Sequence, residues 1–227
     1  RMYKEDIEGS IAHATMLGRC GIIKEEEAND IVKGLKGILA DIENGTLHID
    51  PEAEDIHTFI EGELTKRIGD NGKRLHTSRS RNDQVAVDIK LYLKKEVVNV
   101  KNLVVGLIKV IADKAEKYSE TVMPGYTHLQ RAQPITFGHH LLAYGEMLLR
   151  DVSRLEDCLK RMDEMPLGSC ALAGTTYPID RTITAELLGF DRITNNSLDG
   201  VSDRDFVIEL ANCLALVMMH LSRFCEE

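Results

Sequence analysis

The sequence lacks a cysteine framework. Its five cysteines, at positions 20, 158, 170, 213 and 225, are odd in number and form no Cys-x-x-Cys pair. Such a pattern is typical of reduced thiols in a cytosolic protein, and it offers no zinc framework. We therefore expect most of these cysteines to be small buried apolar residues.

Long hydrophobic runs are also missing. No run of consecutive apolar residues approaches the ~20 residues of a membrane span. No signal peptide is visible at the start, which is Arg1 rather than methionine. We expect a cytoplasmic protein without a membrane partner.

Basic residues are outnumbered by acidic ones, 28 against 37. The 227 residues have a formal net charge of −9, which argues against a nucleic-acid partner because phosphate binding needs a positive surface. A local cluster such as Arg79 and Arg81 can still bind a small anion. Hydrophobic residues make up 43% of the chain and charged residues 29%, as in ordinary globular proteins.

Strand patterns and internal repeats are absent as well, and helical periodicity takes their place. Apolar residues recur every three or four positions, which is typical of helices that bury one face. The expected helices lie at about 6–17, 25–43, 51–68, 85–118, 137–162, 181–188 and from 205 onward. The fold class is therefore predicted to be all-α.

The longest predicted helix, at residues 85–118, would extend about 50 Å at ~1.5 Å per residue. A compact small domain cannot cover such a helix by itself. We therefore expect a small helical domain at residues 1–80 and a bundle of long helices at 81–227. The bundle would be incomplete in this chain and completed by other subunits.

A polar segment at residues 123–134, MPGYTHLQRAQP, separates two of the long helices. Pro124 and Pro134 forbid a simple helical connection, so we expect a loop. His128 can exchange a proton near neutral pH, and the hydrogen-bond donors around it could hold a substrate oxyanion. The alternative is a capped loop between helices with a solvated histidine.

A second polar segment, HTSRSRNDQ at residues 76–84, directly precedes the longest helix. Hydroxyl and amide groups stand where the first N–H groups of a helix lack internal partners. Arg79 and Arg81 add two guanidinium groups whose geometry suits carboxylates. The segment could bind a dicarboxylate, or it could be an elaborate N-cap with solvated arginines.

Three weaker signals have structural interpretations. His57 and Glu61, four residues apart, could share a metal, but with no third ligand in the sequence we expect them to pair with each other. In VSDRD, at residues 201–205, Arg204 is expected to hold the loop through ion pairs. The His139–His140 pair is expected to be structural.

Together, the segments at 76–84 and 123–134 resemble the first and second signatures of the argininosuccinate lyases, which are members of the fumarase/aspartase superfamily. The resemblance implies β-elimination of argininosuccinate to arginine and fumarate, in arginine biosynthesis. It also implies a homotetramer, in which three subunits build each active site, and no metal or organic cofactor.

Site residues follow from the same resemblance. His128 matches the catalytic histidine and would do acid/base or proton-relay work. Asn82 and Thr127 would bind the succinyl portion of the substrate. Ser78, Arg81 and Gln130 would be their neighbours. Asp55 and His57 would border the active-site cleft.

One departure from the family pattern is plain. The third signature, roughly Gly-Ser-Ser-x-Met-Pro-x-Lys-x-Asn-Pro, carries the serine thought to be the catalytic base and is absent here. Gly168-Ser169-Cys170 is similar only superficially, so Ser169 is not nominated. We expect an internal fragment of a longer lyase that is inactive alone.

Three other functions stay open at this point. Another lyase of the superfamily could act on adenylosuccinate, aspartate or malate. A non-enzymatic structural protein is also compatible, since lens crystallins have been recruited from this family. A helical scaffold without an active site would require the two polar segments to be coincidental.

Overall fold

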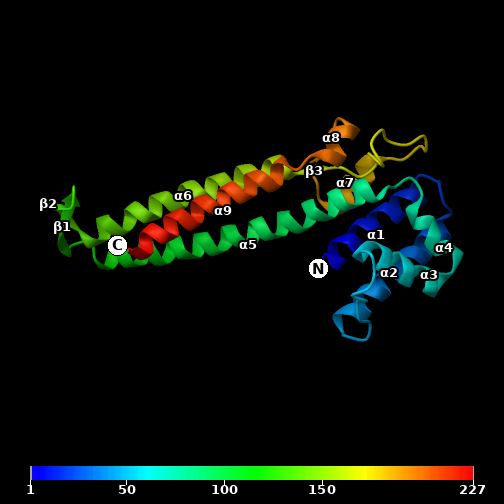
Figure 1. Cartoon of the computed structure of the whole chain (residues 1–227), viewed down its shortest axis with the longest axis horizontal. Coiled ribbons are helices and arrows are strands. Elements are labelled where there is room, and N and C mark those ends of the chain that lie inside the picture. The colour runs from blue at the N-terminus through cyan, green and yellow to red at the C-terminus, as the bar shows by residue number, and fades with distance from the viewer. Residues whose placement is uncertain (1, 227) are drawn as a thin grey trace. The chain divides into compact units, whose positions relative to one another are not determined.

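The computed structural model describes residues 2–226 and is mostly helical (Figure 1). It divides into two compact units. Unit 1 contains residues 1–94 and 163–203, and unit 2 contains residues 95–162 and 204–227. Helix α5, Arg81–Lys117, contributes its first part to unit 1 and the rest to unit 2. The domain boundary that we expected at residue 80 stays a prediction.

The core of unit 1 is built from three helices: α1 (Tyr3–Arg19), α2 (Glu25–Glu43) and α3 (Ile56–Ile68). Helix α2 begins with three glutamates, where the helix dipole favours negative charge. It ends at Glu43 and is followed by the capping residue Asn44 and by Gly45, which has a positive φ of 79°. Apolar side chains from all three helices are fully buried: Ile7, Leu17, Ile31, Leu35, Ile38, Ile60 and Leu64.

One expectation for this region was wrong. Helix α3 begins at Ile56 instead of near residue 51, because the carboxylate of Asp55 accepts a hydrogen bond from the Thr58 amide (2.6 Å) and caps it there. After α3 the chain forms a short helix, α4 (Asp70–Lys73). It leads into a single 3₁₀ turn, η1 (Arg74–His76).

The rest of unit 1 follows residue 163. Strand β3 (Glu164–Met165) pairs in parallel with β4 (Arg192–Ile193), and two short helices, α7 (Arg181–Leu188) and α8 (Ser197–Ser202), lie in the same region. A second buried cluster joins this part to α1 and α5: Ala12, Val87, Leu91, Met165, Leu167, Ala185, Leu188 and Phe190. Segments distant in the sequence are thereby packed together.

Unit 2 contains the long helices α6 (Phe137–Met162) and α9 (Asp205–Glu226), together with the remainder of α5. The bounds of α6 and α7 agree with the sequence-based prediction. Unit 2 has its own apolar core: Val104, Ile111, Ala115, Leu141, Tyr144, Leu148 and Val217. One polar pair is also buried, where Nδ1 of His220 lies 2.6 Å from Oδ2 of Asp151.

The polar segment at residues 123–134 is a β-hairpin, so the expected loop without strands was wrong here. Strand β1 (Val122–Thr127) pairs antiparallel with β2 (Gln130–Thr136). Most of its side chains are exposed on both faces. The hairpin therefore has no apolar–polar alternation, which is the signal that would have predicted strands.

Helix α9 also requires a correction. By length and composition it could cross a membrane, although the run of consecutive apolar residues is interrupted. One such helix is weak support for a membrane protein, because core helices of soluble proteins pass the same test. Phe206, Leu210, Cys213, Val217 and His220 of α9 are buried within unit 2.

Candidate active site

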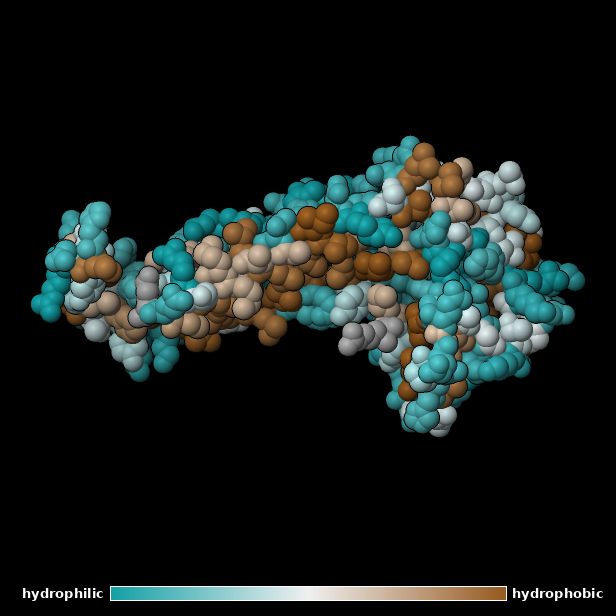
Figure 2. Space-filling model, in the orientation of Figure 1, coloured by the Kyte–Doolittle hydropathy of each residue, from teal (hydrophilic) through white to brown (hydrophobic). Residues whose placement is uncertain are grey.

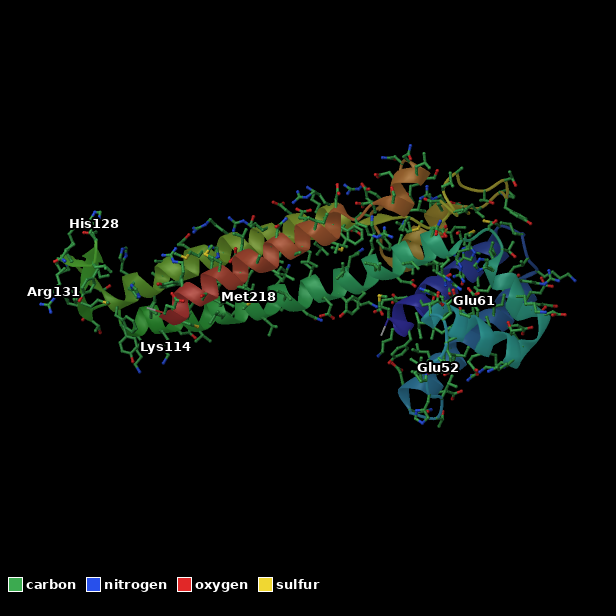
Figure 3. The ribbon with its side chains drawn as sticks, viewed as in Figure 1. Glu52, Glu61, Lys114, His128, Arg131 and Met218 are labelled. Carbon is green, nitrogen blue, oxygen red and sulfur yellow. The ribbon has the colours of Figure 1, made fainter. Side chains whose placement is uncertain are left out.

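The tip of the β1–β2 hairpin presents three of the nominated residues. Thr127 and Gln130 are register partners at the ends of the two strands, and His128 lies in the two-residue turn between them. All three side chains are exposed, and Figure 3 shows His128 and Arg131 projecting from the hairpin. A hydroxyl, an imidazole and a carboxamide thus converge over four consecutive residues.

The turn itself is in an unusual backbone conformation. His128 and Leu129 have positive φ values of 53° and 59°. Two-residue hairpin turns favour positive φ at both positions because this matches the twist of the strands, but they usually use asparagine and glycine. A histidine and a leucine cost roughly 1–2 kcal/mol each in this region. Such strain often accompanies functional positions. Here the backbone conformation of His128 sets the direction in which its side chain leaves the turn.

A pocket of about 630 Å³ lies between the hairpin and the start of α6. Thr127 and Gln133 contribute polar groups to it, and His139 and His140 line its helix side. The ring of His140 stacks on Phe137 with centroids 6.3 Å apart and meets the edge of Tyr144 at 5.5 Å. These ring contacts support a packing role for His140.

Unit 1 holds the arginine corner, which we define as Arg79 and Arg81. Arg81 lies 3.3 Å from a carboxylate oxygen of Asp55 and 3.2 Å from Glu61, and it donates to the Gln84 amide oxygen. Buried Arg79 donates to Ser10 (2.8 Å) and lies 3.4 Å from Glu61. Acidic side chains therefore already contact both guanidinium groups.

Glu61 is the residue that sequence reasoning missed in this corner. Burial alone would raise its pKa, but the hydrogen bond with His76 and the charges of Arg79 and Arg81 lower it to about 2. Glu61 is therefore ionised near neutral pH and organises the arginines. An incoming carboxylate would have to share or displace this contact.

Ser78 and Asn82 lie against the segment between β3 and α7. The hydroxyl of Ser78 is 3.3 Å from that of Thr175, and the Asn82 amide donates to the carbonyl of Ala171 (2.8 Å). Beside them, buried Asp83 accepts hydrogen bonds from the backbone amides of Gly168 (3.0 Å) and Cys170 (2.8 Å). Asp83 thus anchors this segment beside two nominated substrate-binding residues.

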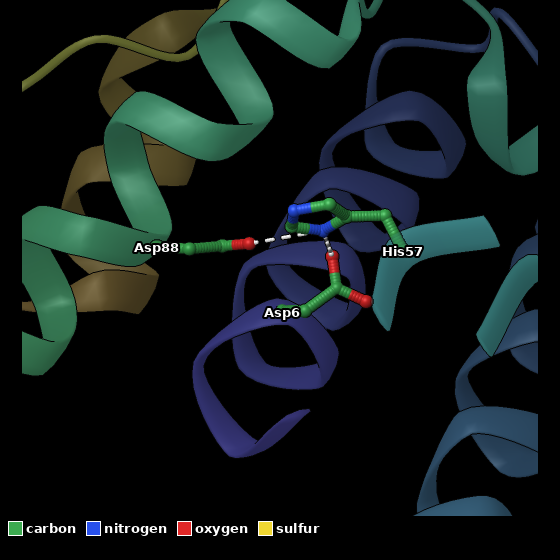
Figure 4. Close-up of side chains that lie close together, drawn as sticks. All are labelled: Asp6, His57 and Asp88. Carbon is green, nitrogen blue, oxygen red and sulfur yellow. Dashed lines mark hydrogen bonds and ion pairs between the residues drawn. The ribbon is translucent and has the colours of Figure 1, made fainter. Parts of the chain in front are cut away.

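His57 does not pair with Glu61, so that prediction was wrong. Its Nδ1 lies 2.8 Å from Oδ1 of Asp6 and 3.3 Å from Oδ2 of Asp88, in a buried cluster (Figure 4). Glu61 pairs instead with His76, at 3.3 Å. Burial and the nearby Asp6 carboxylate raise the pKa of Asp88 well above its usual value. The partners of His57 are distant in sequence, which spacing along one helix cannot reveal.

The nominated residues therefore fall into two groups. Thr127, His128 and Gln130 belong to unit 2, and the other five belong to unit 1: Asp55, His57, Ser78, Arg81 and Asn82. The first group gathers at the hairpin tip. In the second group Asp55 contacts Arg81, whereas Ser78 and Asn82 contact the segment between β3 and α7, and His57 lies in a separate buried cluster. That the two groups act on one substrate stays a prediction.

Comparisons with known proteins identify relatives of the chain. The chain is 62% identical over all 227 residues to proteins named argininosuccinate lyase from Desulforamulus reducens and from Heliobacterium mobile. It spans about half the length of these curated relatives, 49% and 50%. The structure of an EDDS lyase variant with bound fumarate is also similar, with a TM-score of 0.90 at 33% sequence identity. The match covers 99% of this chain and 44% of the EDDS lyase chain.

A family model described as "Lyase" matches residues 1–227, which is the whole chain. The described structure is mostly helical, as are the superfamily structures that it matches. The chain therefore belongs to this lyase family.

Proposed function

We propose that this chain forms part of an argininosuccinate lyase, which eliminates fumarate from argininosuccinate and releases arginine. The observation that carries the proposal is the exposed hairpin tip, where His128 stands between Thr127 and Gln130. The 62% identity to argininosuccinate lyases over the whole chain supports the choice of substrate. We place the full-length protein in the cytoplasm.

In this reaction a base removes a proton from the carbon next to a carboxylate. The electron pair forms the carbon–carbon double bond of fumarate, and the bond to the guanidinium nitrogen of the arginine portion breaks. That nitrogen leaves with its electron pair and takes a proton from an acid. The difficult step is the carbanion-like intermediate, whose charge must spread into the neighbouring carboxylate.

The nominated residues suit these demands. The Thr127 hydroxyl and the Gln130 amide can donate hydrogen bonds to a substrate carboxylate, and Arg81 with Asn82 can do the same from the arginine corner. His128 is assigned acid/base or proton-relay work, because an imidazole exchanges a proton near neutral pH. Ser78 completes the set of neutral donors.

We also propose that the full-length protein is a homotetramer whose long helices share a core. Unit 2 supports this proposal because it leaves many large apolar side chains exposed on its long helices, including Leu103, Val110, Leu149, Ile208 and Met218. Figure 2 shows the corresponding apolar band along these helices. Exposed apolar surface of this extent is typical of subunit interfaces.

The test follows fumarate release by ultraviolet absorbance from the full-length protein. Argininosuccinate, adenylosuccinate, aspartate and malate are offered in parallel. We expect turnover of argininosuccinate alone, with a loss in kcat of about 10²–10⁴-fold in His128→Asn. The matched control is His48→Asn, a histidine exposed on the segment after α2, which should retain wild-type turnover.

The other outcomes are equally informative. Turnover of a different substrate would support the elimination chemistry but would show that argininosuccinate is not the substrate. A folded tetramer that turns over none of the four would favour a structural protein related to these lyases. Full activity in His128→Asn would remove this histidine from the mechanism.

A further inference from the structure

Three helices of unit 1 bring one imidazole and two carboxylates together in its interior. Asp6 comes from α1, His57 from α3 and Asp88 from α5, and each offers a ligand atom within 4.8 Å of the others (Figure 4). We propose that this cluster binds a single divalent transition-metal ion, Zn²⁺ or Mn²⁺, which ties the three helices together. The proposal is independent of the lyase activity.

The separations between the ligand atoms suit a common metal centre. A metal ion about 2.0–2.2 Å from each ligand holds neighbouring ligand atoms about 2.9–3.4 Å apart, depending on whether its geometry is octahedral or tetrahedral. Nδ1 of His57 lies 2.8 Å from Oδ1 of Asp6 and 3.3 Å from Oδ2 of Asp88. The third separation, between the two carboxylates, is within 4.8 Å.

Three carboxylate oxygens in the cluster have unmet bonding capacity. Within residues 2–226, Oδ2 of Asp6 and Oδ1 of Asp88 are buried without a hydrogen-bond partner, and Oδ2 of Asp88 makes no hydrogen bond beside its 3.3 Å ion-pair contact with His57. Buried polar atoms are almost always satisfied, so each exception needs an explanation such as an ion or a water. A bound cation would coordinate such oxygens directly or through a water in its open coordination position.

The charge balance also favours a divalent cation. The side chains of Asp6 and Asp88 are 0% and 1% exposed, so two carboxylates are removed from water around one imidazole. Burying charges is costly unless they are neutralised by close partners. A divalent ion would balance the charge of two ionised carboxylates at once.

The surroundings hold the ligands as a metal site requires. The side-chain amide of Gln84 donates to Oδ1 of Asp6 (2.6 Å), which fixes the orientation of that carboxylate. Gly9 lets α1 approach α5 closely, because a Cβ added at Gly9 would lie 3.3 Å from Oδ1 of Asp88. An imidazole with two carboxylates suits a transition metal better than Mg²⁺ or Ca²⁺, which prefer oxygen ligands throughout.

The test uses the full-length protein, stripped with a chelator and titrated calorimetrically with Zn²⁺ and separately with Mn²⁺. We expect one equivalent to bind per chain and to raise the melting temperature. Asp88→Asn and Asp6→Asn should each weaken binding at least about 100-fold. The matched control is Asp151→Asn, which alters a buried aspartate–histidine pair with a single carboxylate and should leave metal binding unchanged.

A measurement without variants keeps the proposal testable if a substitution prevents folding. Anomalous X-ray scattering from crystals soaked in Mn²⁺ or Zn²⁺ should show a peak between His57 and Asp88. Absence of saturable binding to the stripped wild-type protein would overturn the proposal and indicate that a shared proton holds the cluster. An anomalous peak elsewhere in the protein would also overturn the proposal. So would an Asp88→Asn variant that still binds one equivalent of metal.

Discussion

Single buried residues give unit 1 a built-in sensitivity to acid. His13 is fully buried, and its Nε2 donates a hydrogen bond to the carbonyl of Thr77 (2.8 Å). Burial, together with the positive charge of Arg79, lowers the pKa of His13 to about 3. Between pH 6.5 and 3 the unfolded chain therefore binds a proton that the folded chain excludes.

This difference predicts the effect of His13→Gln. In the wild-type protein His13 should reduce the free energy of unfolding by about 1.4 kcal/mol for each pH unit below 6.5. Glutamine can still donate to the Thr77 carbonyl but does not titrate, so the variant should lose less stability between pH 6.5 and 4. Urea unfolding at several pH values measures this slope.

The exposed histidine His48 provides the control, since His48→Gln should keep the wild-type pH dependence. If His13→Gln keeps it as well, the acid sensitivity comes from other groups. Glu61 is one such group, because its stabilisation is present above its unfolded pKa of about 4.5 and is lost as the pH falls toward 2.

At the scale of helices and strands, the crossing of α5 and α6 depends on one glycine. A Cβ added at Gly138 would collide with the carbonyl oxygen of Ala115 and lie 3.1 Å from Cα of Ser119. Both atoms belong to the backbone, which cannot move aside as a flexible side chain can. The amide of Gly138 also donates to the Tyr118 carbonyl (3.1 Å), which holds the two segments together.

We therefore predict that Gly138→Ala destabilises unit 2 by about 1–3 kcal/mol. The control is Gly106→Ala, another helical glycine, whose added Cβ meets no atom within 4 Å. That change should stabilise α5 by about 0.5–1 kcal/mol, because alanine is the better helix former. Equal effects of the two substitutions in thermal unfolding would contradict the proposed close contact.

Helices with one apolar stripe could be predicted well from the sequence, and segments without such a stripe could not. The bounds of α2, α6 and α7 follow from local periodicity and capping residues. The β1–β2 hairpin escaped prediction because its two faces are both exposed. Its turn also uses His128 and Leu129 in place of the usual asparagine and glycine.

The candidate site shows the same division. His128 and the arginine corner could be nominated because each lies in a dense polar segment beside a long helix. The partners that organise these groups could not, since Glu61 is 20 residues from Arg81 and Asp6 is 51 from His57. Contacts of this kind are decided by how helices pack, which one sequence does not reveal.

For the whole molecule, the exposed apolar side chains of unit 2 predict the assembly state. Met218 is 63% exposed on α9 (Figure 3), and we expect it to be covered by other copies in the full-length protein. Met218→Glu would place a charge in that expected interface, so it should convert the proposed tetramer to smaller species. Size-exclusion chromatography with light scattering measures the change.

A charge substitution on polar surface is the control. Lys114→Glu alters an exposed lysine of α5 in the same unit and should leave the assembly intact. A tetramer that persists in Met218→Glu would mean that this part of α9 is not an interface. The apolar band would then need another explanation, such as contact with further parts of the same chain.

The discontinuity of unit 1 has a consequence for synthesis on the ribosome. The cluster of α1, α2 and α3 is local in sequence, so it can form soon after these helices emerge. The second cluster forms later, because Val87 and Leu91 of α5 pack against residues that are synthesised much later: Met165, Leu167 and Phe190. At ~5–20 residues per second, the 109 residues from Lys94 to Asp203 take about 5–20 s to translate. During that interval one apolar face of α5 is a natural substrate for chaperones.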